Sequence, residues 1–210
     1  MYEHFWKRLI DIVLSTIGIV IAAIPMLIIA LLIKIDSPGP VFFKQERVGK
    51  CKKNFTIIKF RTMPVDVPKD VPTHLFKAED MLSEWQLRLR KSSLDEIPQF
   101  FCIWLGSMTI VGPRPALWNQ DDLIAERDKY GANDIKPGLT GWAQINGRDE
   151  LEIPVKAALD GEYTAMLKLG GLRAFGMDLK CFFGSVKSVF RNDGVVEGGT
   201  GQINQKAGTK

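Results

Sequence analysis

The stretch LIDIVLSTIGIVIAAIPMLIIALLI, residues 9–33, decides the fold of this chain, because it is long and apolar enough to be a membrane element. Its only charge is Asp11 and its only strong helix breaker is Pro25. At about 1.5 Å per residue, an unbroken helix of this length would cross a hydrocarbon core of roughly 30 Å. Length alone therefore permits a full span.

Two features of this stretch favour a helix that enters one leaflet and returns. Pro25 removes a backbone hydrogen-bond donor and clashes with the preceding turn, so the helix should bend there into two legs. Lysine and arginine flank both ends, and the positive-inside rule assigns such flanks to the cytoplasm. We therefore predict a re-entrant membrane helix over residues 1–36, provided that the backbone groups freed at the bend find partners.

Other interpretations of the apolar stretch exist. A single membrane span with a tolerated proline kink accounts for the pattern equally well. A cleaved signal peptide fits less well, because the apolar core is too long and no small-residue cleavage site precedes the next charged segment.

The rest of the chain predicts one cytoplasmic domain over residues 37–190 and a flexible polar tail over residues 191–210. The three cysteines show no close pairing, as expected for reduced thiols. Anionic headgroups or phosphorylated substrates are the expected partners of the segment that follows the membrane element. Nucleic acid is the competing partner, but no nucleic-acid motif supports it. In residues 41–65, the single acid Glu46 stands against seven cations, Lys44, Arg47, Lys50, Lys52, Lys53, Lys59 and Arg61.

The pattern beyond residue 36 predicts a predominantly helical α+β domain with a small antiparallel β-hairpin. The hairpin joins VFFKQERVG at 41–49 to FTIIKFRTM at 55–63. The Gly- and Pro-rich segment IKPGLTGWAQINGRDE at 135–150 is expected to be an ordered loop. The last two predicted helices are amphipathic and suit either the core or the membrane interface. Apolar spacing predicts helices over residues 78–91, 94–107, 121–131, 153–169 and 176–190.

The chemistry is expected at Ser93-Leu94-Asp95-Glu96. Ser followed three residues later by Glu is also the pattern of a capping box, so a purely structural interpretation stands beside the functional one. The neighbouring cations Arg88, Arg90 and Lys91 favour the functional interpretation. A carboxylate among guanidinium groups stays ionised at neutral pH, and it can act as a nucleophile or hold a magnesium ion.

The segments RKSSLDEIPQF at 90–100, VGPRP at 111–115 and KPGLTGWAQINGR at 136–148 resemble the bacterial monotopic phosphoglycosyl transferases. These are the sugar transferases that begin the assembly of capsule, exopolysaccharide and glycoprotein glycans. KRLIDI, SPGPVFFKQERVG and KFRTM, nearer the N-terminus, look like the same family in the same order. The resemblance extends to about Tyr163, and the family's membrane element is a proline-broken re-entrant helix.

The resemblance implies transfer of a sugar 1-phosphate from a UDP-sugar to a polyprenol phosphate, typically undecaprenyl phosphate, with release of UMP. The reaction would take place on the cytoplasmic face of the bacterial inner membrane. Asp95 matches the family's nucleophile, which forms a covalent phosphosugar intermediate. Glu96 is its neighbour in the catalytic dyad and is assigned, with Asp95, to Mg²⁺ binding. Two displacements through one nucleophile predict ping-pong kinetics.

Several other residues match the family as candidates for the site. Taken singly, each cation would be a solvated surface charge, although Arg114 and Arg148 lie in Gly- and Pro-rich segments that can be fixed around an anion. Asp160 and Asp178 are weaker candidates, which would support the metal or an arginine, or be surface acids on helices. The cations expected to bind substrate phosphate are Lys59, Arg61, Arg90, Arg114 and Arg148.

Some positions depart from the family pattern, and other functions stay compatible with the sequence. Ile24 stands before Pro25 where some members have serine, and the segment between Tyr163 and Asp178 is unusually rich in glycine. One alternative function is a membrane-attached glycosyltransferase that moves only the sugar and releases UDP. The other is a non-catalytic module that binds anionic lipid. The residues indicate neither the identity of the UDP-sugar, nor the glycan pathway, nor an oligomeric state.

Overall fold

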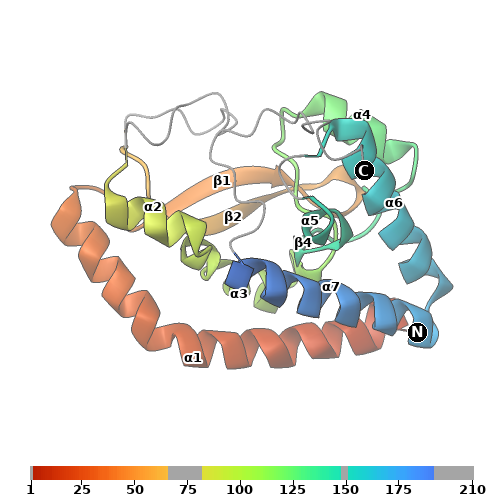
Figure 1. The fold of residues 1–210 in the computed structure, drawn as a ribbon, viewed down its shortest axis with the longest axis horizontal. Helices are drawn as coiled ribbons and strands as arrows, with labels where there is room; N and C mark the ends of the chain where they lie inside the picture. Colours follow the sequence, from red (N-terminus) through yellow and green to blue (C-terminus); the bar gives the residue numbers. More distant parts are fainter. Residues whose placement is uncertain (1, 66–81, 148–150, 192–210) are drawn as a thin grey trace, which may run out of the picture.

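The computed structural model describes residues 2–65, 82–147 and 151–191, with side chains to residue 188 in the last range. The fold is mostly helical. A long N-terminal helix lies along one side of a domain that contains two small sheets of two strands each (Figure 1). The predicted tail over residues 191–210 lies almost wholly outside the described residues, as do Arg148 and most of the segment between residues 64 and 81.

The apolar stretch forms helix α1, Lys7–Asp36, after a π-helical turn over Tyr2–Trp6. Pro25 lies inside α1, and the ribbon bends partway along its length (Figure 1). Within the described residues, Tyr2–Asp36 is the one segment long and apolar enough to cross a membrane by length and composition. One face of α1 is buried against the domain, and its residues recur every four or seven positions, at Lys7, Asp11, Ser15, Ala22, Ile29 and Ile33.

The predicted hairpin is confirmed as strands β1, Phe42–Val48, and β2, Asn54–Phe60, which pair antiparallel. Because side chains alternate along each strand, residues directly opposite one another share a face of the hairpin. Phe43 lies opposite Lys59, and Arg47 lies opposite Phe55. Lys59 and Arg47 therefore lie on the same face of the hairpin.

The prediction of a loop over residues 135–150 is wrong in part. Strand β4, Gly138–Thr140, pairs in parallel with β3, Thr109–Val111, and the short helix α5, Trp142–Ile145, follows. The strands approach so closely that a Cβ on Gly138 would lie 2.1 Å from the backbone nitrogen of Gly112. Glycine here is therefore a requirement of strand pairing, and the sequence rule that assigns glycine to loops missed it.

The other helices follow the predicted order. Helix α6, Ile153–Leu169, matches the prediction at both ends. The predicted helix over residues 94–107 divides into a 3₁₀ turn, Leu94–Glu96, and α3, Gln99–Leu105, with Pro98 between them and Gly106 ending α3 in the left-handed conformation. The remaining helices are α2, Glu84–Lys91, α4, Asp121–Asp128, and α7, Gly171–Arg191. Helices α2, α3 and α4 are shorter than predicted, and α7 begins five residues earlier.

The glycine-rich segment between Tyr163 and Asp178 forms the corner between α6 and α7. Gly170 and Gly171 both have positive φ, 68° and 59°, so the chain can reverse there without a side-chain clash. The main core combines residues of β2, α3, β3, α6 and α7 with Met108, which lies between α3 and β3. Its members include Ile57, Ile103, Val111, Tyr163 and Cys181.

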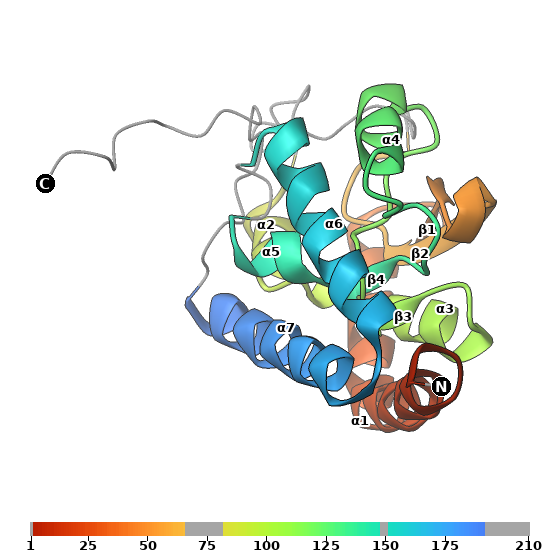
Figure 2. The same ribbon diagram turned by 90° about the vertical axis from the view of Figure 1, so that its right-hand side faces the viewer.

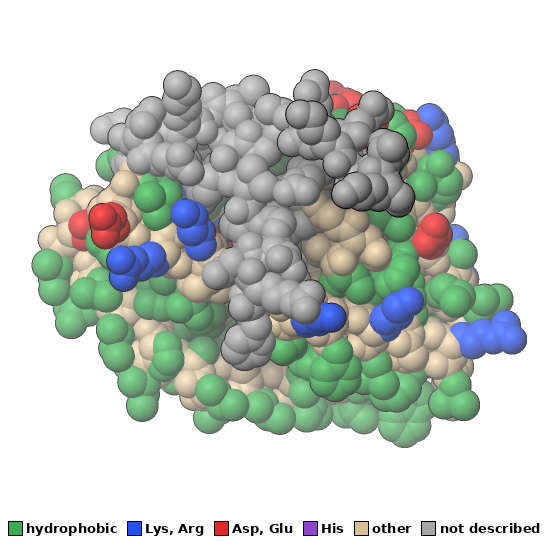
Figure 3. Space-filling view, viewed as in Figure 1, with side chains coloured by type: hydrophobic (Ala, Val, Ile, Leu, Met, Phe, Trp, Pro, Cys, Tyr) green, Lys and Arg blue, Asp and Glu red, His purple; other side chains and the backbone are tan. Residues whose placement is uncertain are grey.

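Helices α1, α3 and α7 lie together on one side of the domain in both views (Figures 1 and 2). Hydrophobic side chains line the corresponding lower edge in Figure 3. This exposed apolar surface includes α3 and α7 as well as α1. Leu172 at the start of α7 is 87% exposed, and Leu105 at the end of α3 is 72% exposed. Further exposed apolar residues on α3 and α7 are Phe101, Trp104, Phe175, Leu179, Phe183 and Val186.

Candidate active site

The Glu96 carboxylate lies between two cations that come from distant parts of the chain. Lys59, on β2, donates from Nζ to Glu96 Oε1 at 2.6 Å. Arg114, three residues after β3, donates from Nη2 to the same oxygen at 2.5 Å and from Nη1 to Oε2 at 3.2 Å. A bidentate arginine fixes both the position and the plane of a carboxylate. Glu96 is therefore held rigidly at the junction between α2 and α3.

The capping-box interpretation of Ser93 and Glu96 is wrong. Ser93 has the left-handed φ of 57° and makes no side-chain capping hydrogen bond, while the Glu96 carboxylate is occupied by Lys59 and Arg114. The capping box lies ten residues earlier, where Ser83 and Gln86 begin α2. The Ser-to-Glu spacing thus has no capping role, and the functional interpretation of Asp95 and Glu96 stays a prediction.

Asp95 differs from its neighbour in both its contacts and its ionisation. Both carboxylic residues are 9% exposed, but in the described parts of the chain no hydrogen bond or ion pair reaches Asp95. Burial raises the pKa of Asp95 to about 6, and the charge of Glu96 adds to this effect. The opposing influence of Lys59 and Arg90 is weaker than burial.

The ionisation of Glu96 is shifted in the opposite direction. Burial by itself would raise the pKa of Glu96, but Arg114 and Lys59 outweigh it and hold that pKa well below its usual range. Two adjacent carboxyl groups whose pKa values are driven apart are typical of sites where each has its own chemical role. Here Glu96 is fixed and ionised, while Asp95 makes no hydrogen bond or ion pair with the residues that the structure describes.

Two more of the predicted cations can be placed relative to this pair. Arg90, in the last turn of α2, is close enough for its charge to lower the pKa of Asp95. Arg61 is held differently, because its guanidinium donates to the carbonyl oxygens of Ser37 and Pro38, each at 2.9 Å. These bonds join the end of the hairpin to the exit of α1. A role of Arg61 in phosphate binding stays a prediction, and Arg148 lies outside the described residues.

The two weaker candidates are buried, so their interpretation as surface acids is wrong. Asp160 is 1% exposed and accepts two hydrogen bonds from Arg127, at 2.8 and 2.6 Å. It therefore supports an arginine, and the pair joins α6 to α4. Burial raises the pKa of Asp160, although Arg127 opposes the shift.

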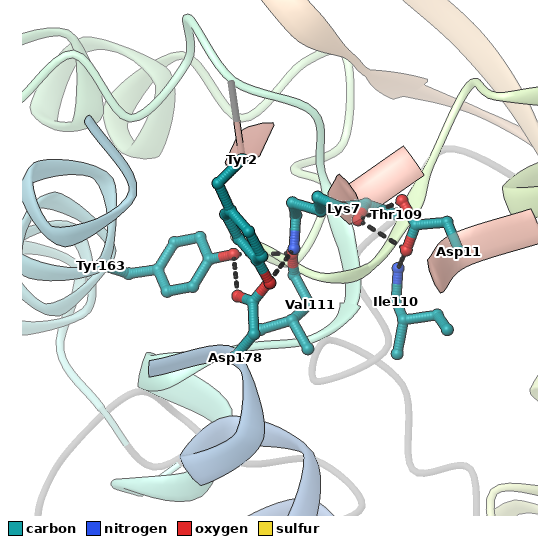
Figure 4. Close-up of polar contacts among 8 residues, drawn as sticks. All are labelled: Tyr2, Lys7, Asp11, Thr109, Ile110, Val111, Tyr163 and Asp178. Carbon is teal, nitrogen blue, oxygen red and sulfur yellow. Dashed lines mark hydrogen bonds and ion pairs between the residues drawn. The ribbon is translucent and has the colours of Figure 1, made fainter. Parts of the chain in front are cut away.

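Asp178 anchors the N-terminal end of the long helix to the domain (Figure 4). Its Oδ2 accepts from Lys7 Nζ at 2.6 Å and from the Tyr2 hydroxyl at 2.7 Å, and its Oδ1 accepts from Tyr163 at 2.7 Å. The Tyr163 hydroxyl also lies 2.9 Å from the carbonyl oxygen of Val111, the last residue of β3. Asp178 thus joins α1, α6, α7 and β3 at one point.

A second buried acid reinforces this junction. Asp11 accepts from the Thr109 hydroxyl at 2.7 Å and from the Ile110 backbone N–H at 2.9 Å, so it joins α1 to the start of β3 (Figure 4). The single charge within the apolar stretch therefore faces the domain. This is why a strongly apolar helix tolerates it.

Sequence reasoning missed two residues beside the site, Gln45 and Arg47. It counted Arg47 only among the positive charges of residues 41–65. The alternation of side chains along the strands would have found both. Lys59 lies opposite Phe43, so every second residue from Phe43, namely Gln45 and Arg47, lies on the same face of the hairpin as Lys59.

The donor set decides how a magnesium ion could be bound. In the described residues no group of three His, Cys, Asp or Glu side chains lies close enough to form a metal cage. Mg²⁺ is commonly bound through one or two carboxylates together with substrate phosphates and water. The Asp95 carboxylate, to which no hydrogen bond from a described residue is made, fits this second mode beside Glu96.

Comparison with known proteins finds one family model and several relatives that match most of the chain. The model of the family described as "Bacterial sugar transferase" matches residues 2–192. The chain is similar to the "Uncharacterized sugar transferase EpsL" of Bacillus subtilis, 34% identical over 90% of this chain and 89% of that protein. It is similar to the "Exopolysaccharide production protein PSS" of Rhizobium leguminosarum, 35% identical over 87% of this chain and 94% of that protein.

A third relative carries a more specific name. The "UDP-glucose:undecaprenyl-phosphate glucose-1-phosphate transferase" of Escherichia coli is 39% identical over 67% of this chain. The match spans 31% of the length of that longer protein.

Proposed function

Because the chain belongs to the bacterial sugar transferase family, we propose that it transfers a sugar 1-phosphate from a UDP-sugar to a polyprenol phosphate, such as undecaprenyl phosphate, and releases UMP. The observation that carries this proposal is the contrast between two adjacent carboxylates. Glu96 is held by Lys59 and Arg114, while Asp95 is buried beside it without an ion pair among the described residues.

The first step is attack by Asp95 on the UDP-sugar. A carboxylate oxygen of Asp95 forms a bond to the phosphorus that carries the sugar. The bond from this phosphorus to the bridging oxygen breaks, and UMP leaves with the electron pair. The product is an acyl phosphate that joins Asp95 to the sugar phosphate. A raised pKa makes Asp95 a better nucleophile than an ordinary aspartate, yet leaves it mostly ionised at neutral pH.

The second step returns the enzyme to its starting state. A phosphate oxygen of the polyprenol phosphate attacks the same phosphorus, and the Asp95 carboxylate leaves. The lipid then carries a diphosphate linked to the sugar. Both steps require an anion to approach an anion, so the cations around Asp95 must lower the repulsion and stabilise the charge on phosphorus oxygens. Lys59, Arg90 and Arg114 are the described residues best placed for this task.

We propose that Mg²⁺ assists the reaction. Asp95 would hold the ion through a carboxylate oxygen together with substrate phosphate, and Glu96 would contribute an oxygen that also accepts from Lys59 or Arg114. When bound, it would neutralise charge on the phosphate oxygens.

We also propose that α1 enters one leaflet and returns, so that the domain lies on the cytoplasmic side of the bacterial inner membrane. Cationic residues at both ends of α1, Lys7 and Lys34, support this topology. The exposed apolar residues of α3 and α7 extend the face of α1, so these helices would lie in the membrane interface. Asp95 lies shortly before α3, and this arrangement keeps it near the lipid headgroups.

Product analysis tests the proposed reaction. Purified protein in vesicles that contain undecaprenyl phosphate should release UMP from a UDP-sugar, and Asp95→Asn should abolish the release while the protein stays membrane-bound. Release of UDP would instead identify a glycosyltransferase that moves only the sugar. Unchanged membrane binding with no turnover of any UDP-sugar in a panel would favour a lipid-binding module.

The topology has its own test. Single cysteines placed before Trp6 and at the C-terminal end should both react with an impermeant thiol reagent from the cytoplasmic side only. Labelling from opposite sides would mean that α1 crosses the membrane.

A further inference from the structure

The hairpin that supplies Lys59 presents a second cation toward the site. Lys59 lies opposite Phe43, Ile57 opposite Gln45, and Phe55 opposite Arg47. Directly opposed residues of antiparallel strands share a face, so Lys59, Gln45 and Arg47 point to the same side. Gln45 is buried on that side.

Arg47 is held by its neighbour on the same face. Gln45 Oε1 accepts from Arg47 Nε at 3.0 Å and from Arg47 Nη2 at 2.6 Å. Two bonds from one guanidinium to one oxygen fix the plane of the guanidinium. Because Gln45 is itself buried, this pair is a rigid unit on the strand.

The third guanidinium nitrogen of Arg47 reaches the segment that carries Arg114. Arg47 Nη1 donates to the carbonyl oxygen of Pro115 at 3.1 Å, and Pro115 directly follows Arg114. The backbone reinforces the contact, because the Val48 N–H donates to the carbonyl oxygen of Ala116 at 2.9 Å and Arg47 forms an isolated bridge with Leu117. Strand β1 thus holds the chain directly after Arg114.

The location of Arg47 carries an electrostatic cost. Burial lowers the pKa of Arg47 to about 10, the like charge of Arg114 contributes to the shift, and Glu96 opposes it. An apolar residue at this position would avoid both the burial of a charge and the repulsion. The bonds to Gln45 and to Pro115 are what an apolar residue could not supply.

We propose that Arg47, oriented by Gln45, is a positioning residue that fixes the Pro115 carbonyl and thereby keeps the guanidinium of Arg114 in bidentate contact with Glu96. One strand pair then sets both partners of Glu96: β2 supplies Lys59 directly, and β1 positions Arg114 through Arg47. The catalytic consequence rests on the proposed function, because it concerns the carboxylate pair that would act on the UDP-sugar.

A double-mutant cycle tests the proposal. Arg47→Met should lower kcat/KM for UMP release by about 10- to 100-fold, the effect expected when a catalytic group is displaced by about 1 Å. The same substitution should have almost no further effect in an Arg114→Met background, because Arg47 acts through Arg114. Gln45→Leu, which keeps the charge of Arg47 but removes its support, should reproduce part of the loss.

Matched controls separate positioning from general effects of charge or folding. Lys44→Met removes a cation from the exposed, opposite face of β1 and should leave kcat/KM within about twofold of wild type. Arg47→Lys can donate to the Pro115 carbonyl but cannot reproduce the planar fork, so its activity should lie between those of wild type and Arg47→Met.

The results that overturn the proposal are distinct from those that overturn the proposed function. An unchanged kcat/KM for Arg47→Met, or a loss that persists in full in the Arg114→Met background, would mean that Arg47 does not act through Arg114. If wild type releases UDP, the proposed function fails and the same cycle is measured on UDP release.

If wild type turns over no UDP-sugar, amide hydrogen exchange tests whether Arg47 holds the segment after Arg114. Arg47→Met should then speed exchange at Val48 and Leu117, and unchanged exchange at both would overturn the proposal.

Discussion

The ammonium group of Lys59 lies 2.6 Å from Oε1 of Glu96, although the two residues are separated by 37 positions in the chain. The contact depends on the register of the hairpin, because a shift of one residue would turn Lys59 to the opposite face. Within the described residues, the two cations that bind Glu96 form no ion pair with Asp95, although both influence its pKa. The geometry of the hairpin thus decides which of the two adjacent acids receives Lys59.

Removal of Lys59 should disable the site more than it destabilises the fold. Lys59→Met leaves Glu96 with Arg114 alone and takes away a cation that would face the phosphate, so kcat/KM should fall by at least about 100-fold. Measurement of UMP release gives the ratio. Lys53→Met, an exposed cation before the second strand of the same hairpin, should stay within about twofold of wild type. Equal losses for the two variants would mean that general surface charge explains the effect.

The pH dependence should report the ionisation of Asp95. Asp95 attacks only as a carboxylate, so kcat/KM for the UDP-sugar should rise with pH and level off above a pKa of about 6. In a ping-pong reaction this ratio reports on the first step alone and is independent of the lipid phosphate. Because Arg90 lowers the pKa of Asp95, Arg90→Met should move the acidic limb to higher pH. If the acidic limb of the pH profile does not move in Arg90→Met, the limb reports the ionisation of a group other than Asp95.

Substitution of Asp95 should stabilise the protein at neutral pH. Burial raises the pKa of Asp95 from 3.8 to about 6, so the folded state favours the protonated form. The stabilisation from this group is present below pH 3.8 and is lost as the pH rises through 6. Asp95→Asn avoids this loss of folding stability, which amounts to at most about 3 kcal/mol.

The sign of this effect can be read from thermal unfolding at several pH values. The Tm of Asp95→Asn should exceed that of wild type at pH 7.5, and the difference should shrink toward pH 5. A difference that grows as the pH falls would contradict the burial of an ionisable Asp95.

The junction around Asp178 should be essential for attachment of α1 to the domain. Lys7→Met leaves the buried Asp178 without its cation, and loss of one partner of a buried ion pair costs about 3–5 kcal/mol. Asp178→Asn in the same background should recover part of the loss, because the tyrosine hydroxyls can still bond to the amide. Unfolding in detergent measures the change, with the exposed Lys34→Met as the control. If the double variant is as unstable as the sum of the single ones, the ion pair is not the cause.

The elements with strong local patterns could be predicted from the sequence. The apolar stretch predicted α1, alternation predicted the hairpin, and apolar spacing predicted α6 at both ends. The parallel pair β3 and β4 could not be predicted, because three-residue strands have no measurable periodicity and glycine is ordinarily a loop signal.

The candidate site shows the same division between local and long-range information. The resemblance placed Lys59 and Arg114 at the site, and the structure brings both to Glu96. The burial of Asp160 and Asp178 depends on packing between helices, which a helical pattern with a mixed surface does not specify. The role of Gln45 and Arg47 depends on cross-strand register and on a loop more than sixty residues away.

In the proposed reaction, Asp95 becomes covalently bonded to the phosphorus of the sugar phosphate. Protein mixed with UDP-sugar alone, quenched in acid and digested, should contain a peptide with Asp95 whose mass is increased by one sugar phosphate. The increase should disappear when polyprenol phosphate is added and should be absent in Asp95→Asn. Lipid product formed at the wild-type rate by Asp95→Asn, or formed by wild type without this adduct at any time after mixing, would contradict the account.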